Sequence, residues 1–135
     1  MDVGKARIGV AFNVGELVLA HGVLPRDSAA AGKVVEISRE RGAERTFVGL
    51  PLSLTGEQTG STQDALSFAR ELAAAGLQVF LVDERLTTKS ASGNLRQVGI
   101  DAKKGKAIVD AESARIILEA ALHSHLAKPL EEFNA

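Results

Sequence analysis

The spacing of apolar and polar residues divides the chain into short strands and amphipathic helices. Residues 7–12 form a short apolar run, residues 16–23 alternate loosely, and turn-forming residues lie between them at 13–15. This pattern predicts a β-hairpin. Apolar side chains at helical spacing then predict a helix over residues 27–41, with Gly42 placed to end it.

Strands and helices alternate through the rest of the chain. Residues 46–50 and 78–82 predict two buried strands, separated by a helix with Ser61 as N-cap, Asp64 as its capping-box partner and Gly76 beyond its end. Two further helices are predicted, from Thr88 to about residue 98 and over residues 108–127, with a basic loop at 99–105. Alternation implies parallel crossovers and the hairpin adds antiparallel strands, so we predict an α/β fold with a mixed sheet flanked by helices.

Composition narrows the class of protein. The 135 residues, 45% of them hydrophobic and 24% charged, predict a single globular domain over residues 1–135. The sequence contains no apolar run long enough to span a membrane, no signal-peptide pattern and no cysteine, so we expect a cytoplasmic protein without a membrane partner. A net charge of −1 counts modestly against nucleic-acid binding, and the local distribution of charge must decide.

Three acidic positions are candidates for chemistry. Asp83 and Glu84 directly follow a predicted strand, where open α/β sheets bind ligands, although alternation lets only one of them point easily into the crevice. Asp110 shares a helix stripe with small and apolar residues, where a carboxylate needs a partner or a metal ion. Asp2 opens the chain. Each acid also has a structural reading, as a solvated turn residue, a helix N-cap or a chain end.

Together the acids suit divalent-metal chemistry. Mg²⁺ prefers oxygen ligands, and two such ions can support phosphodiester cleavage. A zinc site is not expected, because the chain lacks cysteine and its histidines are poorly spaced for one; these are His21, His123 and His125.

Four short segments resemble, in order, the motifs of the YqgF/RuvX family. They are residues 2–11, 48–52, 83–88 and 110–118. The resemblance implies a ribonuclease H-like fold with a mixed five-stranded sheet. It also implies a nuclease, described as a pre-16S ribosomal RNA processing enzyme and earlier as a Holliday junction resolvase. Its catalytic and metal-binding acids correspond to Asp2, Glu84 and Asp110, with Mg²⁺ or Mn²⁺ held by Asp2 and Glu84 and a second ion by Asp2 and Asp110.

The start of the chain departs from the family pattern. Relatives usually carry several residues before the motif aspartate, which form the first half of a central strand, whereas only Met1 precedes Asp2 here. We expect either a start farther upstream or weak metal binding.

Basic residues indicate where a nucleic acid would lie. We expect contacts from a cluster beside Asp110 and from two arginines near the acids, which contact phosphate, orient carboxylates or form structural salt bridges; the residues are Arg96, Lys103, Lys104, Lys106, Arg7 and Arg85. The chain has no Trp or Tyr, which favours recognition of shape over base stacking. The expected partners are pre-rRNA or branched DNA, and the small ribosomal subunit precursor, bound by a monomer or weak homodimer.

Three alternatives stay open beside the RNA-processing nuclease. A junction resolvase should be a two-fold dimer, and the sequence lacks a strong exposed apolar helix face for one. A non-catalytic nucleic-acid-binding module with an eroded site is favoured by the short start. A kinase of the actin-like fold needs a much longer chain than 135 residues.

Overall fold

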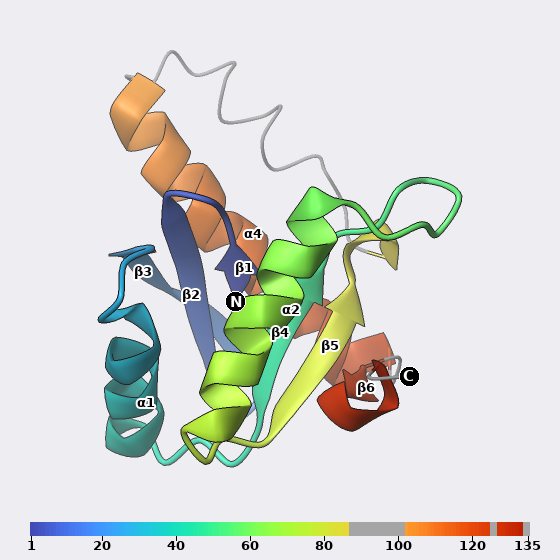
Figure 1. Ribbon diagram of the computed structural model, residues 1–135. Coiled ribbons are helices and arrows are strands. Elements are labelled where there is room, and N and C mark those ends of the chain that lie inside the picture. The colour runs from blue at the N-terminus through green and yellow to red at the C-terminus, as the bar shows by residue number, and fades with distance from the viewer. Residues whose placement is uncertain (87–101, 125–126, 134–135) are drawn as a thin grey trace.

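The computed structural model describes residues 1–86, 102–124 and 127–133, and Figure 1 shows their arrangement. The elements, in chain order, are β1 (Asp2–Val3), β2 (Arg7–Val14), β3 (Leu17–Pro25), α1 (Ala30–Glu40), β4 (Thr46–Leu50), α2 (Gly60–Ala74), β5 (Val79–Asp83), the 3-10 turn η1 (Glu84–Leu86), α4 (Ala102–Ser124), β6 (Lys128–Pro129) and the 3-10 turn η2 (Leu130–Phe133). The predicted mixed α/β class is confirmed.

The strands form two three-stranded sheets, in the orders β1-β2-β3 and β4-β5-β6. The first sheet is antiparallel, whereas β4 and β5 run parallel. Two backbone hydrogen bonds join the sheets: the Met1 amine donates to the Phe47 carbonyl at 2.6 Å, and the Gly49 N–H donates to the Met1 carbonyl at 2.9 Å. Instead of the expected single five-stranded sheet, the structure has two three-stranded sheets, and they meet at Met1.

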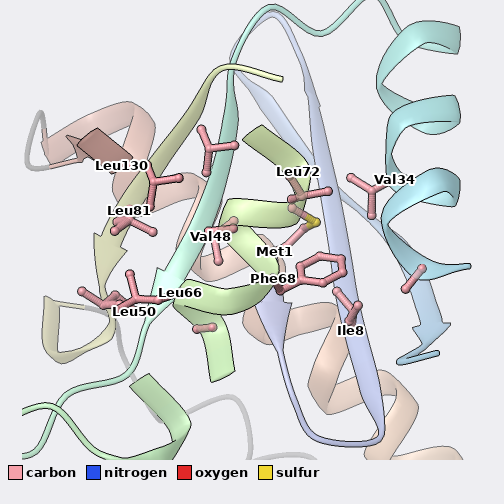
Figure 2. Close-up of a cluster of buried hydrophobic side chains, with 14 of the residues drawn as sticks. Met1, Ile8, Val34, Val48, Leu50, Leu66, Phe68, Leu72, Leu81 and Leu130 are labelled. Carbon is pink, nitrogen blue, oxygen red and sulfur yellow. The ribbon is translucent and has the colours of Figure 1, made fainter. Parts of the chain in front are cut away.

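Helices cover both faces of the paired sheets. On one face, α1 and α2 pack on a core that includes Met1, Ile8, Val48, Phe68 and Leu72 (Figure 2). On the other face, α4 contributes its apolar side chains to a second cluster; these are Ile117, Leu118 and Ala121. The result is three layers, with helices on both faces of the sheets and with most of β3 exposed at the outer edge.

The hairpin of β2 and β3 is longer than predicted. Its strands pair as far as Val14 with Leu17, so the turn consists of residues 15 and 16 and not of residues 13–15. Gly15 supplies the positive φ of 60° that this tight turn requires.

The start of α2 corrects a second prediction. Its N-cap is Thr59, whose extended backbone lets the side chain accept from the Thr62 N–H while the Thr62 hydroxyl accepts from the Thr59 N–H. Ser61 therefore lies inside the helix, and Asp64 forms an ion pair with Arg26. The predicted glycines after α1 and α2 are confirmed, because both adopt positive φ just beyond the helix ends: Gly42 and Gly76.

The last long helix begins earlier and ends earlier than predicted. It runs from Ala102 to Ser124, so residues 103–106 belong to α4 and not to a basic loop. Alanine and lysine favour a helix there, and a single glycine at 105 is tolerated. The helix expected over residues 88–98 lies outside the described residues. Across the described ranges, none of the helices is long and apolar enough to cross a membrane.

Candidate active site

The sheet places Asp2 on the face covered by α4. The Met1 side chain is 6% exposed and belongs to the core beneath α1 and α2. Because successive side chains on a strand point to opposite faces, the carboxyl group of Asp2 points the other way, toward α4.

Gly9 brings Asp110 close to Asp2. It is the antiparallel partner of Asp2 on β2, and a Cβ atom at Gly9 would lie 2.0 Å from the backbone carbonyl oxygen of Asp110. Thus α4 rests directly on the β2 backbone, and any side chain at this position would push the helix away.

Gly49 makes room for Glu84 in the same way on β4. A Cβ atom at Gly49 would lie 3.2 Å from Cγ and Cδ of Glu84 and 2.6 Å from Cδ1 of Ile117. The Glu84 side chain therefore folds back from the end of β5 over its neighbour β4, on the α4 face. The three acids form a row: Asp110 over β2, Asp2 on β1 and Glu84 over β4.

The electrostatics of this row are repulsive. Burial raises the pKa of Asp2, the Met1 amine opposes that rise, and the Asp110 carboxylate adds to it. Burial lowers the pKa of the Met1 ammonium to about 6, against the attraction of Asp2 and Glu84. Asp2 thus interacts with Asp110, and both Asp2 and Glu84 act on the same amine. A cation among the three acids would relieve the repulsion.

Arg7 binds one of the acids. Its Nε–H donates to Oδ2 of Asp110 at 2.8 Å, and the arginine side chain is 37% exposed. This contact is a salt bridge that also orients the carboxylate, so it agrees with two of the roles predicted for Arg7.

Arg85 is occupied away from the acidic row. Its Nε–H and Nη2–H groups grip both carboxylate oxygens of Asp83 at 2.6–3.1 Å. These hydrogen bonds lower the pKa of Asp83. The expectation that only one of Asp83 and Glu84 points toward the site agrees with this arrangement.

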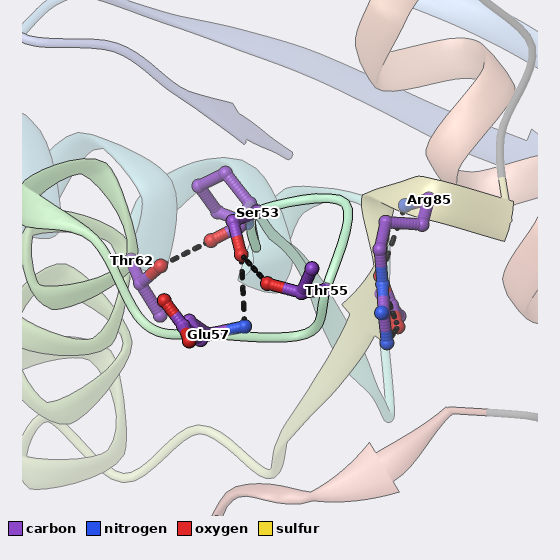
Figure 3. Close-up of polar contacts among 7 residues, drawn as sticks. Ser53, Thr55, Glu57, Thr62 and Arg85 are labelled. Atoms are coloured by element: carbon purple, nitrogen blue, oxygen red, sulfur yellow. Dashed lines mark hydrogen bonds and ion pairs between the residues drawn. The ribbon is translucent and has the colours of Figure 1, made fainter.

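The loop between β4 and α2 is held by its own hydroxyl groups, which the sequence did not indicate (Figure 3). Ser53 Oγ lies 3.0 Å from Thr55 Oγ1 and accepts from the Glu57 N–H at 3.0 Å, and the Thr62 hydroxyl donates to the Pro51 carbonyl. Gly56 lies against Arg85, since a Cβ there would be 3.1 Å from Nη1. The loop is therefore folded beside the strand end that carries Glu84.

An open hollow of about 600 Å³ lies at the start of α2, and its basic residues were also missed from the sequence. Lys5 and Arg26 line it together with Gly60 and Gln63. Arg26 pairs with Asp64 at 3.0 Å. Lys5 and Arg26 lie far apart in sequence and carry no motif, so only the fold brings them together.

Comparison with known proteins identifies the family. A family model described as RuvX, Holliday junction resolvase, matches residues 1–124. The chain belongs to the RuvX family. It is 44% identical over 133 residues to a protein of Clavibacter sepedonicus named "Putative pre-16S rRNA nuclease", a match that covers 94% of this chain and 83% of the relative. Relatives with the same printed name in Leifsonia xyli subsp. xyli and Streptomyces coelicolor are each 42% identical, covering 94% and 92% of this chain and 85% and 78% of their own lengths.

Asp2, Glu84 and Asp110 suit a hard cation, because all three offer carboxylate oxygens. In the conformation seen here Arg7 holds one oxygen of Asp110, and the part of the chain that the structure describes contains no cluster of three or more acidic or histidine groups close enough to hold a metal ion. Carboxylate oxygens are ligands that Mg²⁺ and Mn²⁺ accept, and the three acids lie on the same face of the sheets. Their side chains would have to move for all three to bind the same ions.

The structure describes only part of the basic cluster predicted beside Asp110. Arg96 lies outside the described residues. The backbone of the three lysines belongs to the first turns of α4, four to seven residues before Asp110, and their side chains lie outside the description; they are Lys103, Lys104 and Lys106.

Proposed function

We propose that this RuvX-family protein is a metal-dependent nuclease that processes the 5′ end of pre-16S ribosomal RNA. Its single domain, residues 1–135, would have the ribonuclease H-like fold. The observation that carries the proposal is the row of Asp2, Glu84 and Asp110 across neighbouring strands, with Gly9 and Gly49 clearing the space for it. The names of the relatives support the substrate.

In this proposal the three carboxylates would hold Mg²⁺ or Mn²⁺, with Asp2 and Glu84 as ligands of one ion and Asp2 and Asp110 as ligands of a second. Such ions supply activation of the attacking water and stabilisation of the leaving oxygen. Arg7 orients Asp110 through its Nε–H, and the exposed part of its guanidinium group would donate to a phosphate oxygen.

The substrate backbone would pass between two basic regions. One is the start of α4 with the segment before it, which includes Arg96, Lys103, Lys104 and Lys106. The other is the hollow lined by Lys5 and Arg26. Both regions would contact phosphates, which position a nucleic acid without reading its bases. Arg85, tied to Asp83, would support the loop at Gly56.

The first test is cleavage of a pre-16S RNA 5′ fragment with Mn²⁺ or Mg²⁺ by the wild type, Glu84→Gln and Asp110→Asn. We expect both variants to lose roughly 100-fold or more of the rate, the size typical of losing one group that stabilises a charged transition state. Asp83→Asn is the matched control, because this acid pairs with Arg85 and is expected to keep most of the activity. Equal rates for all four proteins would refute the assignment of the acids.

A Holliday junction resolvase is the second candidate, because the description of the matching family model names that activity. A four-way DNA junction should be assayed beside the RNA. Symmetric cutting of the junction with the RNA intact would select this function. Binding of either substrate without cleavage would select a non-catalytic module.

A further inference from the structure

Leu54 is an apolar side chain that the fold holds out in solvent. It is 90% exposed, more than any other large hydrophobic side chain among the described residues. Its neighbour Leu52 packs instead against the core that α1 and α2 cover. Single exposed hydrophobic residues are common on protein surfaces. What sets Leu54 apart is the loop that holds it and the position of that loop in the fold.

The loop places Leu54 at the tip of a tight turn. The Gly56 N–H donates to the Ser53 carbonyl at 2.9 Å, which closes a four-residue turn. Leu54 and Thr55 are the two central residues of this turn. Behind them, the Ser53 N–H donates to the Glu57 carbonyl and the Glu57 N–H donates to the Ser53 hydroxyl, both at 3.0 Å. A tip that is fixed in this way loses little conformational entropy when it binds a partner.

The turn lies at the end of the sheets that carries the acidic row. The hydrogen bonds of Met1 make β1 parallel to β4, and β5 is also parallel to β4, so these strands end on the same side. Glu84 directly follows β5, and Figure 1 shows the loop after β4 projecting beyond that end. Arg85 connects the two, because it lies against Gly56 and pairs with Asp83.

Basic groups that suit phosphate leave the sheets at the same end. Both β1 and β3 run antiparallel to β2, so they end on the same side. Lys5 follows β1, Arg26 follows β3, and both line the hollow at the start of α2. The loop connects β4, where Gly49 lies beneath Glu84, to Gly60, which also lines the hollow. A nucleic-acid backbone bound to these cations and to the acids would pass the turn.

The surroundings of Leu54 suit a base better than a protein partner. Among the described residues, the other exposed large hydrophobic side chains belong to the β2–β3 hairpin or to α4 and not to this loop. A stable protein interface buries about 1,000 Å² or more, which a single leucine does not provide. The five phenylalanines are all buried or half-buried, so none offers an exposed ring for stacking. Leucine can instead act as a wedge that enters between neighbouring bases and unstacks them.

We propose that Leu54 is a wedge that enters between two stacked bases of the bound nucleic acid, where a paired stretch meets an unpaired one. Unstacking costs least at that point, because one of the two bases has no pairing partner to lose. The kink that a wedge produces would bend the strand toward the acids. The inference rests on the proposed nuclease function and adds to it a class of substrate, a stem that ends in a single strand.

The test follows base stacking with 2-aminopurine, a fluorescent adenine analogue that stacking quenches. The probe is placed at the end of the stem in an RNA hairpin with a single-stranded tail, and protein is added in EDTA at low salt. We expect the wild type and Leu54→Met to raise the fluorescence about threefold or more, and Leu54→Ala to lose most of that rise. Leu17→Ala is the matched control, because Leu17 is 60% exposed on the hairpin at the opposite end of the sheets.

Binding constants separate a wedge from a general contact. Leu54→Ala should weaken binding of the tailed hairpin by about fivefold, because an apolar contact with the bases is lost. Binding of a fully single-stranded RNA of the same length should change by less than about twofold, since such a strand has no stem end to unstack. The Tm of the variant should stay within about 2 °C of the wild type, because exposed side chains contribute little to stability.

The possible outcomes are distinct. Equal fluorescence gains for the wild type and Leu54→Ala would overturn the proposal, and so would an equal weakening of both RNAs. Loss of the signal in Leu17→Ala would contradict the position of the wedge. If the wild type cleaves RNA but shows no rise in fluorescence, only the wedge fails. If none of the proteins binds either RNA, the proposed function fails together with the wedge.

Discussion

The negative charge of Asp2 destabilises the folded protein. Because burial and Asp110 raise its pKa, the folded protein holds this proton to a higher pH than the unfolded chain, in which the usual value is 3.8. The stability that the protonated group contributes is full below 3.8 and is lost as the pH rises through the folded pKa.

Asp2→Asn should therefore stabilise the protein at pH 7 by about 1 kcal/mol, a common gain when a functional residue is replaced. The gain should shrink as the pH falls toward 4. Urea denaturation of both proteins in EDTA, over pH 4 to 8, measures it. A variant less stable than the wild type at pH 7 would contradict this account of Asp2.

Two glycines offer a matched pair. Gly9→Ala puts a Cβ atom 2.0 Å from the Asp110 carbonyl, whereas Gly32 in α1 has nothing within 4 Å of the equivalent point. We expect Gly9→Ala to cost about 3 kcal/mol, because α4 must move. Gly32→Ala should gain about 0.5–1 kcal/mol of helix stability. Chemical denaturation compares them, and similar effects at both positions would show that α4 does not rest on β2.

The first turn of α2 depends on a cap that local pattern does not single out. Thr59→Ala should cost about 1 kcal/mol, because the Thr62 N–H loses its acceptor. Ser61→Ala should change stability little, since Ser61 lies within the helix. Thermal unfolding of the two variants distinguishes the two candidate N-caps. A larger loss of Tm for Ser61→Ala than for Thr59→Ala would show that Ser61 is the N-cap.

Elements were predictable where the information is local. The run at 46–50 matches β4, and the glycines at 42 and 76 mark helix ends, because apolar spacing and positive φ act within a few residues. The cap of α2 was misplaced because Ser61 and Thr59 are both chemically suitable, and only the backbone angles at Thr59 choose between them.

The arrangement of the elements in the whole fold was harder to predict from the sequence. Nothing in the sequence shows that the two sheets meet at Met1, because that depends on pairing between residues 46 or more apart. The acids were proposed from motifs, yet their placement in a row depends on what Gly9 and Gly49 leave empty. The pairing of Arg7 with Asp110 spans 103 positions and has no local signal.

Helix α4 contacts strands of both sheets, from β1, β2 and β3 to β4 and β5. It is also nearly the last element of the chain. During synthesis, residues 1–83 can therefore form strands and two helices, but the acidic row stays incomplete until α4 has left the ribosome and settled on Gly9. Asp110 is therefore made after Asp2 and Glu84, and the proposed row can assemble only once α4 has packed on β2.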